Sequence, residues 1–218
     1  MIRHQPNYHR KMMEKHAVPV RLGVESSEVL ILAEKPDVVV VATGAVAVLP
    51  PVDGMDAARA NGFVLTIDEV MARTAPKTLG ASVIVWGAGE GGELAVELKR
   101  AGHQVRLLDA HRAYTPANHI GSRAMVIAGL LAHAEIPVET GLTLERVGGG
   151  RARFRMADGE TETIAADNLI VCQGRKPLNG LVKGLTGKGF VVHTIGDART
   201  PRFYANAIHE AAYLARQI

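Results

Sequence analysis

Uninterrupted apolar runs recur along the chain, and each ends at a glycine-containing turn. Val38–Ala42, Ser82–Trp86 and Asn168–Cys172 are the clearest of these runs. A run that does not alternate with polar residues is typical of a parallel strand buried on both faces of its sheet. We therefore expect these three segments to be strands of parallel sheets.

Weaker patterns predict the remaining elements. Polar and apolar residues alternate over 151–156, and Asp158-Gly159 then turns the chain toward 162–164, which indicates a β-hairpin. Hydrophobic spacing and turn residues predict further strands at 18–22, 104–108, 137–140 and 190–195, and helices at 7–16, 66–71, 93–101, 119–133 and 206–217.

The strand at 82–86 leads into a glycine-rich turn, Gly87-Ala88-Gly89-Glu90-Gly91-Gly92, followed by a helix and another strand that ends at Asp109. This is the order and length of a βαβ unit. The pattern G-x-G-x-x-G is weak as a bare string, but here a strand precedes it, a helix follows, and an acidic residue ends the next strand. The combination predicts a Rossmann-type dinucleotide-binding unit.

Each glycine of the pattern has an expected physical role. Gly87 permits the tight turn, Gly89 lets the backbone approach a pyrophosphate, and Gly92 removes a Cβ where helix and strand pack. The N–H groups at the start of the helix then face the phosphates, helped by the helix dipole. The alternative is a glycine-rich turn that serves backbone packing only.

The residue that ends the second strand bears on the choice of nucleotide. Asp109 lies where a carboxylate would accept hydrogen bonds from a ribose 2′-hydroxyl, which favours NAD. Arg112 could instead hold a 2′-phosphate, so NADP stays open. The alternative for Asp109 is a solvated strand end.

Composition narrows the chemistry further. The 218 residues are 47% hydrophobic and 22% charged with a formal net charge of +3, which is ordinary for a globular protein with a core. Basic residues are scattered, so we expect no nucleic-acid partner. The apolar runs are far shorter than a membrane span, and the N-terminus lacks the apolar stretch of a signal peptide, so we expect a cytoplasmic protein with no membrane partner. A single cysteine, Cys172, excludes a disulfide framework, a dithiol centre and an iron–sulfur cluster within these residues.

Several motifs together resemble one family. They are Val38–Gly44, the stretch GAGEGGELA at 87–95, Cys172–Pro177, Ile195–Arg202 and Ala207–Ala211. In order and spacing they are similar to the FAD/NAD(P)-binding C-terminal portion of the NADH:flavin oxidoreductase group, which includes 2,4-dienoyl-CoA reductase, trimethylamine dehydrogenase and histamine dehydrogenase.

The resemblance implies an α/β fold of Rossmann-like three-layer domains, in which an NAD(P) unit is inserted into an incomplete FAD-type domain. Residues 1–75 and 166–218 would form the two parts of the FAD-type domain, and residues 76–165 the inserted unit. It implies that the chain crosses between the two domains at Thr43-Gly44 and returns at Gly174, and that Gly44, Gly196 and Asp197 lie near the flavin. The alternative for Asp197 is a residue that only caps a turn. The expected function is to pass hydride from NAD(P)H to FAD and on to an acceptor outside the chain.

One part of the family pattern is missing. Members open their FAD domain with a strand and a G-x-G-x-x-G turn, whereas residues 1–37 contain a single glycine, Gly23. We therefore expect a C-terminal fragment, a truncated product or one subunit of a split enzyme, whose partner is another chain or an N-terminal domain with FMN and an iron–sulfur cluster. FAD binding by this chain alone is then doubtful. The alternatives are a non-catalytic module that binds ADP or NAD, and a dehydrogenase that acts directly on a small substrate.

No side chain is expected to act as a catalytic acid, base or nucleophile, and no metal site is expected. The nine histidines do not pair at i, i+4 beside a carboxylate as in a helical zinc site. Glu90 has two interpretations, a residue near the nicotinamide or a solvated turn residue. Trp86 and Cys172 are expected in the core. The sequence leaves the final substrate, the electron acceptor and the oligomeric state open.

Overall fold

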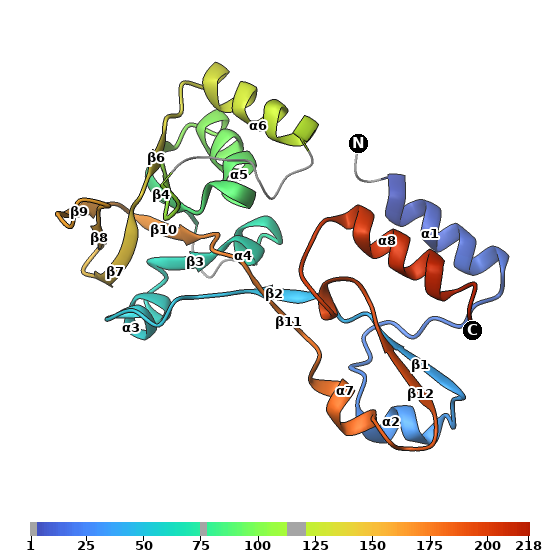
Figure 1. Ribbon diagram of the computed structural model, residues 1–218. Coiled ribbons are helices and arrows are strands. Elements are labelled where there is room, and N and C mark those ends of the chain that lie inside the picture. Colours follow the sequence, from blue (N-terminus) through green and yellow to red (C-terminus); the bar gives the residue numbers. More distant parts are fainter. Residues whose placement is uncertain (1–3, 75–77, 113–120) are drawn as a thin grey trace.

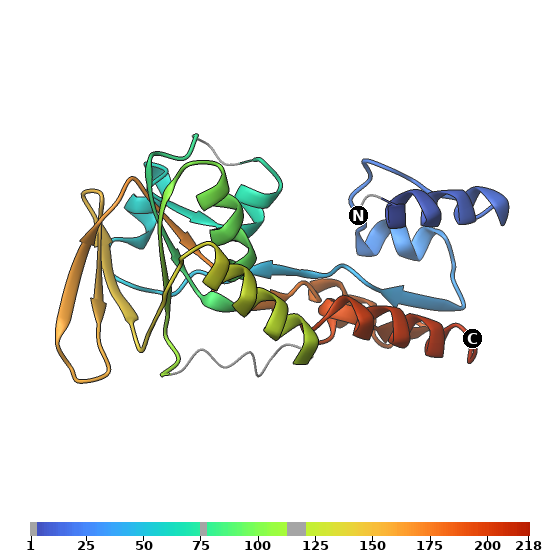
Figure 2. The ribbon, with the colours of Figure 1, turned by 90° about the horizontal axis from the view of Figure 1, so that it is seen from above.

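The computed structural model describes residues 4–74, 78–112 and 121–218. It consists of two bodies that are joined by a pair of extended segments (Figure 1). The larger body holds a five-stranded sheet and the smaller one a two-stranded sheet. Figure 2, seen at right angles, shows the same division.

The sheet of the larger body is parallel throughout. In spatial order its strands are β3 (Val64–Thr66), β10 (Asn168–Val171), β4 (Ser82–Trp86), β5 (Gln104–Asp109) and β6 (Val138–Thr140). All four residues of β10 are buried, as the apolar run predicts for a strand covered on both faces.

Alternate residues of β4 point to opposite layers. Ile84 and Trp86 pack against an antiparallel sheet, together with a short helix, whereas Val83 and Val85 pack against two long helices. The antiparallel layer is β7 (Thr143–Gly148), β8 (Arg151–Arg155), β9 (Thr161–Ala165) and α3 (Met55–Ala60), and the helical layer is α5 (Ala88–Arg100) and α6 (Gly121–His133). The three-layer α/β fold is confirmed. Because both faces of the central sheet are covered by another layer, polar and apolar residues do not alternate along β4 and β10.

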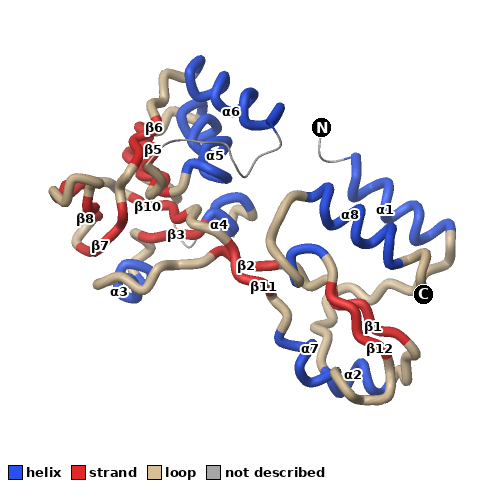
Figure 3. Tube along the Cα trace, in the orientation of Figure 1, coloured by secondary structure: helices blue, strands red, loops and turns tan. Residues whose placement is uncertain are grey.

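The smaller body is built on one pair of parallel strands, β1 (Val38–Val41) and β12 (Val191–Thr194), as Figure 3 shows. Its core is small and centres on Val41, Leu185 and Ala198. Four helices belong to it: α1 (His4–Lys15), α2 (Glu28–Ala33), α7 (Gly180–Leu185) and α8 (Tyr204–Leu214), and a 3₁₀ turn, Gly196–Ala198, follows β12.

Two antiparallel strands connect the bodies, β2 (Ala45–Ala47) and β11 (Arg175–Pro177). Beside them, α4 (Ile67–Met71) begins at a capping box, in which Thr66 accepts from the Glu69 N–H and the Glu69 carboxylate accepts from the Thr66 N–H. Asp68 of α4 accepts a hydrogen bond from the Ala47 N–H at 3.0 Å. These contacts fix where the chain leaves one body and enters the other.

Some expectations need correction. Val18–Leu22 is not a strand: it is irregular and exposed, with Leu22 87% accessible, and no strand among the described residues pairs with it. The helix expected at 93–101 begins at Ala88, so it includes most of the glycine turn. The five-stranded sheet extends beyond the expected limits 76 and 165, since β3 and β10 lie outside them.

Two expectations fall partly outside the described residues. They are the start of the helix expected at 119–133 and the domain boundary expected between residues 75 and 76. Within the part of the chain that the structure describes, no helix has the length and apolarity needed to cross a membrane.

Candidate functional site

A cavity of about 1010 Å³ opens at the carboxyl ends of β10, β4 and β5. Ligands of open α/β sheets bind at this edge, where the connections of neighbouring strands leave in opposite directions. The predicted glycine turn and Asp109 contribute to its wall, and so does Gly174. The structure therefore brings together predicted residues that lie as far apart in sequence as 87 and 174.

The glycine turn is shaped by close contact with the end of β10. Gly87 has φ +113°, and its N–H donates to the Leu108 carbonyl at 2.7 Å. A Cβ at Gly87 would lie 2.6 Å from the carbonyl carbon of Cys172 and closer still to its oxygen. Only glycine fits both the dihedral angle and the space.

A close approach between helix and strand lies at Gly91. A Cβ on Gly91 would stand 2.7 Å from Val85 Cγ1 and 3.2 Å from Cys172 Sγ. Gly92 is also buried in α5. The small residues let the first turn of α5 sit directly on β4 and β10, with its N–H groups at the cavity.

Asp109 is not a solvated strand end, since it is only 6% exposed. One carboxylate oxygen accepts from the Ala88 N–H at 2.6 Å, and the other accepts from the His111 N–H at 2.8 Å. His111 Nδ1 lies 2.7 Å from that second oxygen. Asp109 therefore ties the glycine turn to the residues after β5, and a carboxylate still has acceptor sites to offer a ribose hydroxyl.

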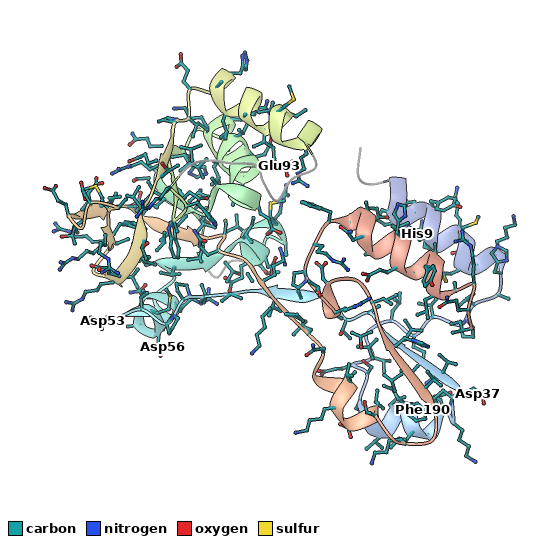
Figure 4. The ribbon with its side chains drawn as sticks, viewed as in Figure 1. His9, Asp37, Asp53, Asp56, Glu93 and Phe190 are labelled. Carbon is teal, nitrogen blue, oxygen red and sulfur yellow. The ribbon has the colours of Figure 1, made fainter. Side chains whose placement is uncertain are left out.

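The structure places Arg112 away from this wall. Arg112 is exposed, and its backbone carbonyl accepts a hydrogen bond from Thr140 Oγ1 at 3.2 Å. It is not among the described residues that line the cavity. His111 and Arg123 line the cavity instead. Arg123 extends from α6 to Glu93 of α5, 2.7 Å away, and Figure 4 labels Glu93 on the helix that faces α6.

Glu90 takes part in an ion-pair cluster on the cavity wall. Arg175 Nε lies 3.0 Å from one Glu90 oxygen, and Arg175 Nη2 lies 2.6 Å from Asp68 Oδ1. The hydrogen bonds to Glu90, and then those to Asp68, raise the pKa of Arg175 above its usual range. Glu90 is thus neutralised by a partner from β11.

The end of β10 supplies two neighbouring side chains of different character. Cys172 is buried against Gly91, and burial raises the pKa of its thiol, so the thiolate is strongly disfavoured. Gln173 lines the cavity beside it. Trp86 is buried as well, and its Nε1–H donates to the Leu142 carbonyl at 2.9 Å. Trp86 and Cys172 therefore both lie in the core, as expected.

The other predicted residues gather in the smaller body. Thr43 and Gly44 follow β1, and Gly196 and Asp197 follow β12, and these strands pair in parallel through Val41 and Thr194. Both pairs consequently lie at the carboxyl ends of β1 and β12. The amino ends of these strands, beside Asp37 and Phe190, lie on the opposite side (Figure 4).

Hydrogen bonds hold the two turns of the smaller body in place. Thr43 Oγ1 donates to the Leu178 carbonyl, and the Gly196 N–H donates to Glu210 Oε2 at 2.7 Å. That bond and the nearby arginines hold the pKa of Glu210 below its usual value. Asp197 Oδ1 accepts from the Arg202 N–H at 3.1 Å, so Asp197 orders the following loop. This loop, Pro201–Tyr204, reaches the same cavity as the glycine turn.

Sequence reasoning did not single out His111, Arg123, Gln173, Arg175 or Pro201–Tyr204 as site residues. Two indications were present, since residues 173–175 directly follow a predicted buried strand and His111 lies two residues after Asp109. The position of Pro201–Tyr204 depends on how the two bodies meet, which the sequence pattern does not show.

Comparisons with known proteins agree with this architecture. The family model described as pyridine nucleotide-disulphide oxidoreductase matches residues 9–207. Bilirubin reductase of Mediterraneibacter gnavus is 27% identical over 210 residues, which are 95% of this chain and 31% of that protein.

Solved structures show the same fold. A 2-naphthoyl-CoA reductase in complex with 2-naphthoyl-CoA matches with a TM-score of 0.81 and 26% identity, over 93% of this chain and 30% of that one. Histamine dehydrogenase from Rhizobium sp. 4-9 matches with a TM-score of 0.72 and 23% identity, over 89% of this chain and 31% of that one. The chain thus spans about a third of the length of these proteins, and its resemblance to their FAD/NAD(P)-binding portion is confirmed.

Proposed function

The chain belongs to the pyridine nucleotide-disulphide oxidoreductase family, and from this premise we propose that it is the pyridine-nucleotide-binding module of a flavoprotein oxidoreductase. NAD(P)H lies across the glycine turn, and the electrons leave by way of FAD to an acceptor outside this chain. The observation that carries the proposal is the 1010 Å³ cavity, in which the Gly87 turn, the start of α5 and Asp109 converge.

The residues present fit a dinucleotide. Gly87 and Gly91 leave out the two Cβ atoms that would disturb the turn, and Asp109 holds the turn from the other side. The first-turn N–H groups of α5 and the helix dipole attract the pyrophosphate, and Asp109 accepts from the adenosine ribose. A carboxylate at this position favours NADH slightly over NADPH.

The chain's own residues bind and orient, whereas the bound cofactors supply the hydride-transfer chemistry. Arg175 neutralises Glu90 beside the glycine turn, which removes a carboxylate that would repel the phosphates. Cys172 stays a buried neutral thiol and does not act as a redox group. The module therefore needs no side chain that moves a proton.

FAD would be held only in part. Thr43, Gly44, Gly196 and Asp197 lie together at the carboxyl ends of β1 and β12, and Gly196 opens its turn with a positive φ. Residues 4–37, however, form α1 and α2 rather than a strand and a glycine turn. The rest of FAD would be bound by a partner chain or by an N-terminal domain. This fits the finding that the chain spans about a third of the proteins that it matches.

The lack of a strand and a glycine turn within residues 4–37 also favours a second candidate function. If the FAD side does not bind flavin, the intact Asp109 side can still bind an adenine nucleotide. The chain would then be a structural ADP- or NAD-binding module without redox activity.

One titration separates the candidates. The purified chain is titrated with NADH, NADPH, FAD and ADP, and both visible absorbance and heat of binding are followed. NADH binding that exceeds ADP binding, or any flavin absorbance, supports the electron-transfer module, and ADP binding as tight as NADH binding without flavin uptake supports the structural module. A chain that binds none of the four contradicts both.

A further inference from the structure

Gln173 carries a buried amide nitrogen for which the described residues provide no hydrogen-bond partner. Among those residues it is the one buried side-chain nitrogen or oxygen atom in this condition. Buried polar groups of folded proteins nearly always have a partner, so an exception calls for an explanation. Gln173 also lines the cavity, which suggests that the missing acceptor belongs to a ligand.

The place of Gln173 in the sheet indicates which part of a dinucleotide it meets. β4 is central, with β5 on one side and β10 on the other. Asp109 ends β5 and marks the adenosine side, and the start of α5 after β4 takes the pyrophosphate. A ligand that continues across this edge brings its nicotinamide riboside half over the end of β10, where Gln173 lies.

The backbone around Gln173 is held firmly. The Cys172 N–H donates to the Trp86 carbonyl at 2.8 Å, and this continues the pairing of β10 with β4 beyond the last strand residue. On the other side, Arg175 is fixed by its ion pairs to Asp68 and Glu90. The backbone that carries the amide therefore stands at a defined position before any ligand arrives, which favours specific recognition.

The chemistry of the position suits a neutral ligand group. The charges of Arg175 and Glu90 are paired with each other, so the polar group left to the ligand at the end of β10 is a neutral amide donor. The nicotinamide riboside offers matching acceptors, namely its ribose hydroxyl oxygens and the carboxamide oxygen.

We propose that Gln173 Nε2 donates a hydrogen bond to the nicotinamide riboside half of the bound dinucleotide, so that Gln173 distinguishes NAD(P)H from nucleotides that lack this half. This inference rests on the proposed function and adds a specificity-determining residue to it. It concerns binding alone, and no bond is made or broken at Gln173.

The test compares NADH with ADP-ribose, which shares the adenosine, the pyrophosphate and a ribose but lacks the nicotinamide. Gln173→Met keeps the length of the side chain and removes the donor, and Gln173→Leu removes the whole amide without adding a charge. Gln104→Met is the matched control, because Gln104 is exposed at the opposite end of β5. Affinities are measured by calorimetry, and thermal midpoints are measured without ligand.

Both Gln173 variants are expected to bind NADH roughly three- to tenfold more weakly, the effect of one neutral hydrogen bond. ADP-ribose affinity stays within about twofold of the original if the bond goes to the carboxamide, and it falls by less than NADH affinity if a ribose hydroxyl shares the bond. Without ligand, Gln173→Met raises the thermal midpoint, because an unpaired buried donor has been removed. Gln104→Met changes none of these values.

Unchanged NADH affinity in both Gln173 variants would overturn the inference. So would equal losses for NADH and ADP-ribose accompanied by a lower midpoint, which would mean a structural role. If the original chain binds ADP-ribose as tightly as NADH, the inference is wrong while adenine-nucleotide binding stands. If it binds neither, the proposed function itself fails.

Discussion

Replacing Gly87 by alanine tests the geometry on which the nucleotide site depends. Gly87 combines φ +113° with a Cβ position only 2.6 Å from the Cys172 carbonyl carbon and 3.1 Å from the Cys172 Cβ. The neighbours that must move belong to the backbone at the end of β10, so no side-chain rotation relieves the contact. Gly102, at the other end of α5, has φ +96° and nothing within 4 Å of its Cβ position, which makes Gly102→Ala the matched control.

The two substitutions share one cost and differ in another. An L-residue forced into positive φ loses about 1–2 kcal/mol, and this applies to both. Overpacking against fixed atoms adds roughly 1–3 kcal/mol at Gly87 alone. We therefore expect the free energy of unfolding to fall by about 1–2 kcal/mol in Gly102→Ala and by about 2–5 kcal/mol in Gly87→Ala.

Urea denaturation of both variants measures this difference, and calorimetry with NADH measures its functional consequence. The shift that accommodates the alanine at Gly87 moves the glycine turn away from β10, so NADH affinity falls by more than about tenfold, whereas Gly102→Ala leaves it unchanged. Equal losses of stability in the two variants, or full NADH affinity in Gly87→Ala, would refute the reasoning.

Three further predictions concern other parts of the larger body. Asp109→Asn replaces one of the two carboxylate oxygens, which accept separately from the Ala88 and His111 N–H groups, and calorimetry should show NADH affinity falling roughly tenfold and more than NADPH affinity; equal losses would contradict the ribose contact. The Arg59 hydrogen bond lowers the pKa of Glu69 from 4.5 to about 2, so its contribution to stability is complete above pH 4.5 and is lost as the pH falls toward 2. Urea titrations near about pH 6 and about pH 3 should show that Glu69→Gln loses about 1–2 kcal/mol of stability at the higher pH and clearly less at the lower pH, and a loss that does not depend on pH would argue against the ion pair. Phe154→Ala should cost about 3–5 kcal/mol in the same assay, because Phe154 is fully buried, and a loss below about 1 kcal/mol would mean that this face of the sheet is loosely packed.

The strands of the larger body were predictable because their own sequence decides their environment. Ser82–Trp86 matches its predicted bounds, since an apolar run of this length has to be covered on both faces. Val18–Leu22 is also rich in apolar residues, but Pro19 has no N–H to donate to a neighbouring strand, and no strand among the described residues pairs with this segment. The start of α5 was misplaced for a related reason: glycine disfavours helix, but at Gly91 contact with Val85 decides the conformation.

The residues of the candidate site also fall into two groups: some follow from a local sequence pattern, and others depend on contacts that form only in the folded chain. Asp109 and the glycine turn follow from one local βαβ pattern, which the sequence displays within about two dozen residues. Arg175 does not, because its partners Asp68 and Glu90 lie 107 and 85 residues away along the chain. The partnerless amide of Gln173 is likewise a property of the folded cavity and of no local pattern.

The charges around the cavity indicate where its attraction for a dinucleotide arises. Arg123 is paired with Glu93, Arg175 with Asp68 and Glu90, and Arg202 with Glu210, so each arginine of the described wall already has a carboxylate partner. A paired guanidinium offers a pyrophosphate little net charge. In the first turn of α5 the Ala88 N–H donates to Asp109 and the Gly91 N–H to the Gly87 carbonyl, which leaves the N–H groups of Gly89 and Glu90, two residues that line the cavity at the positive end of the helix dipole. We therefore expect backbone geometry to hold a pyrophosphate in the proposed site, so that the glycines at 87 and 91 matter more for nucleotide affinity than an arginine of the described wall.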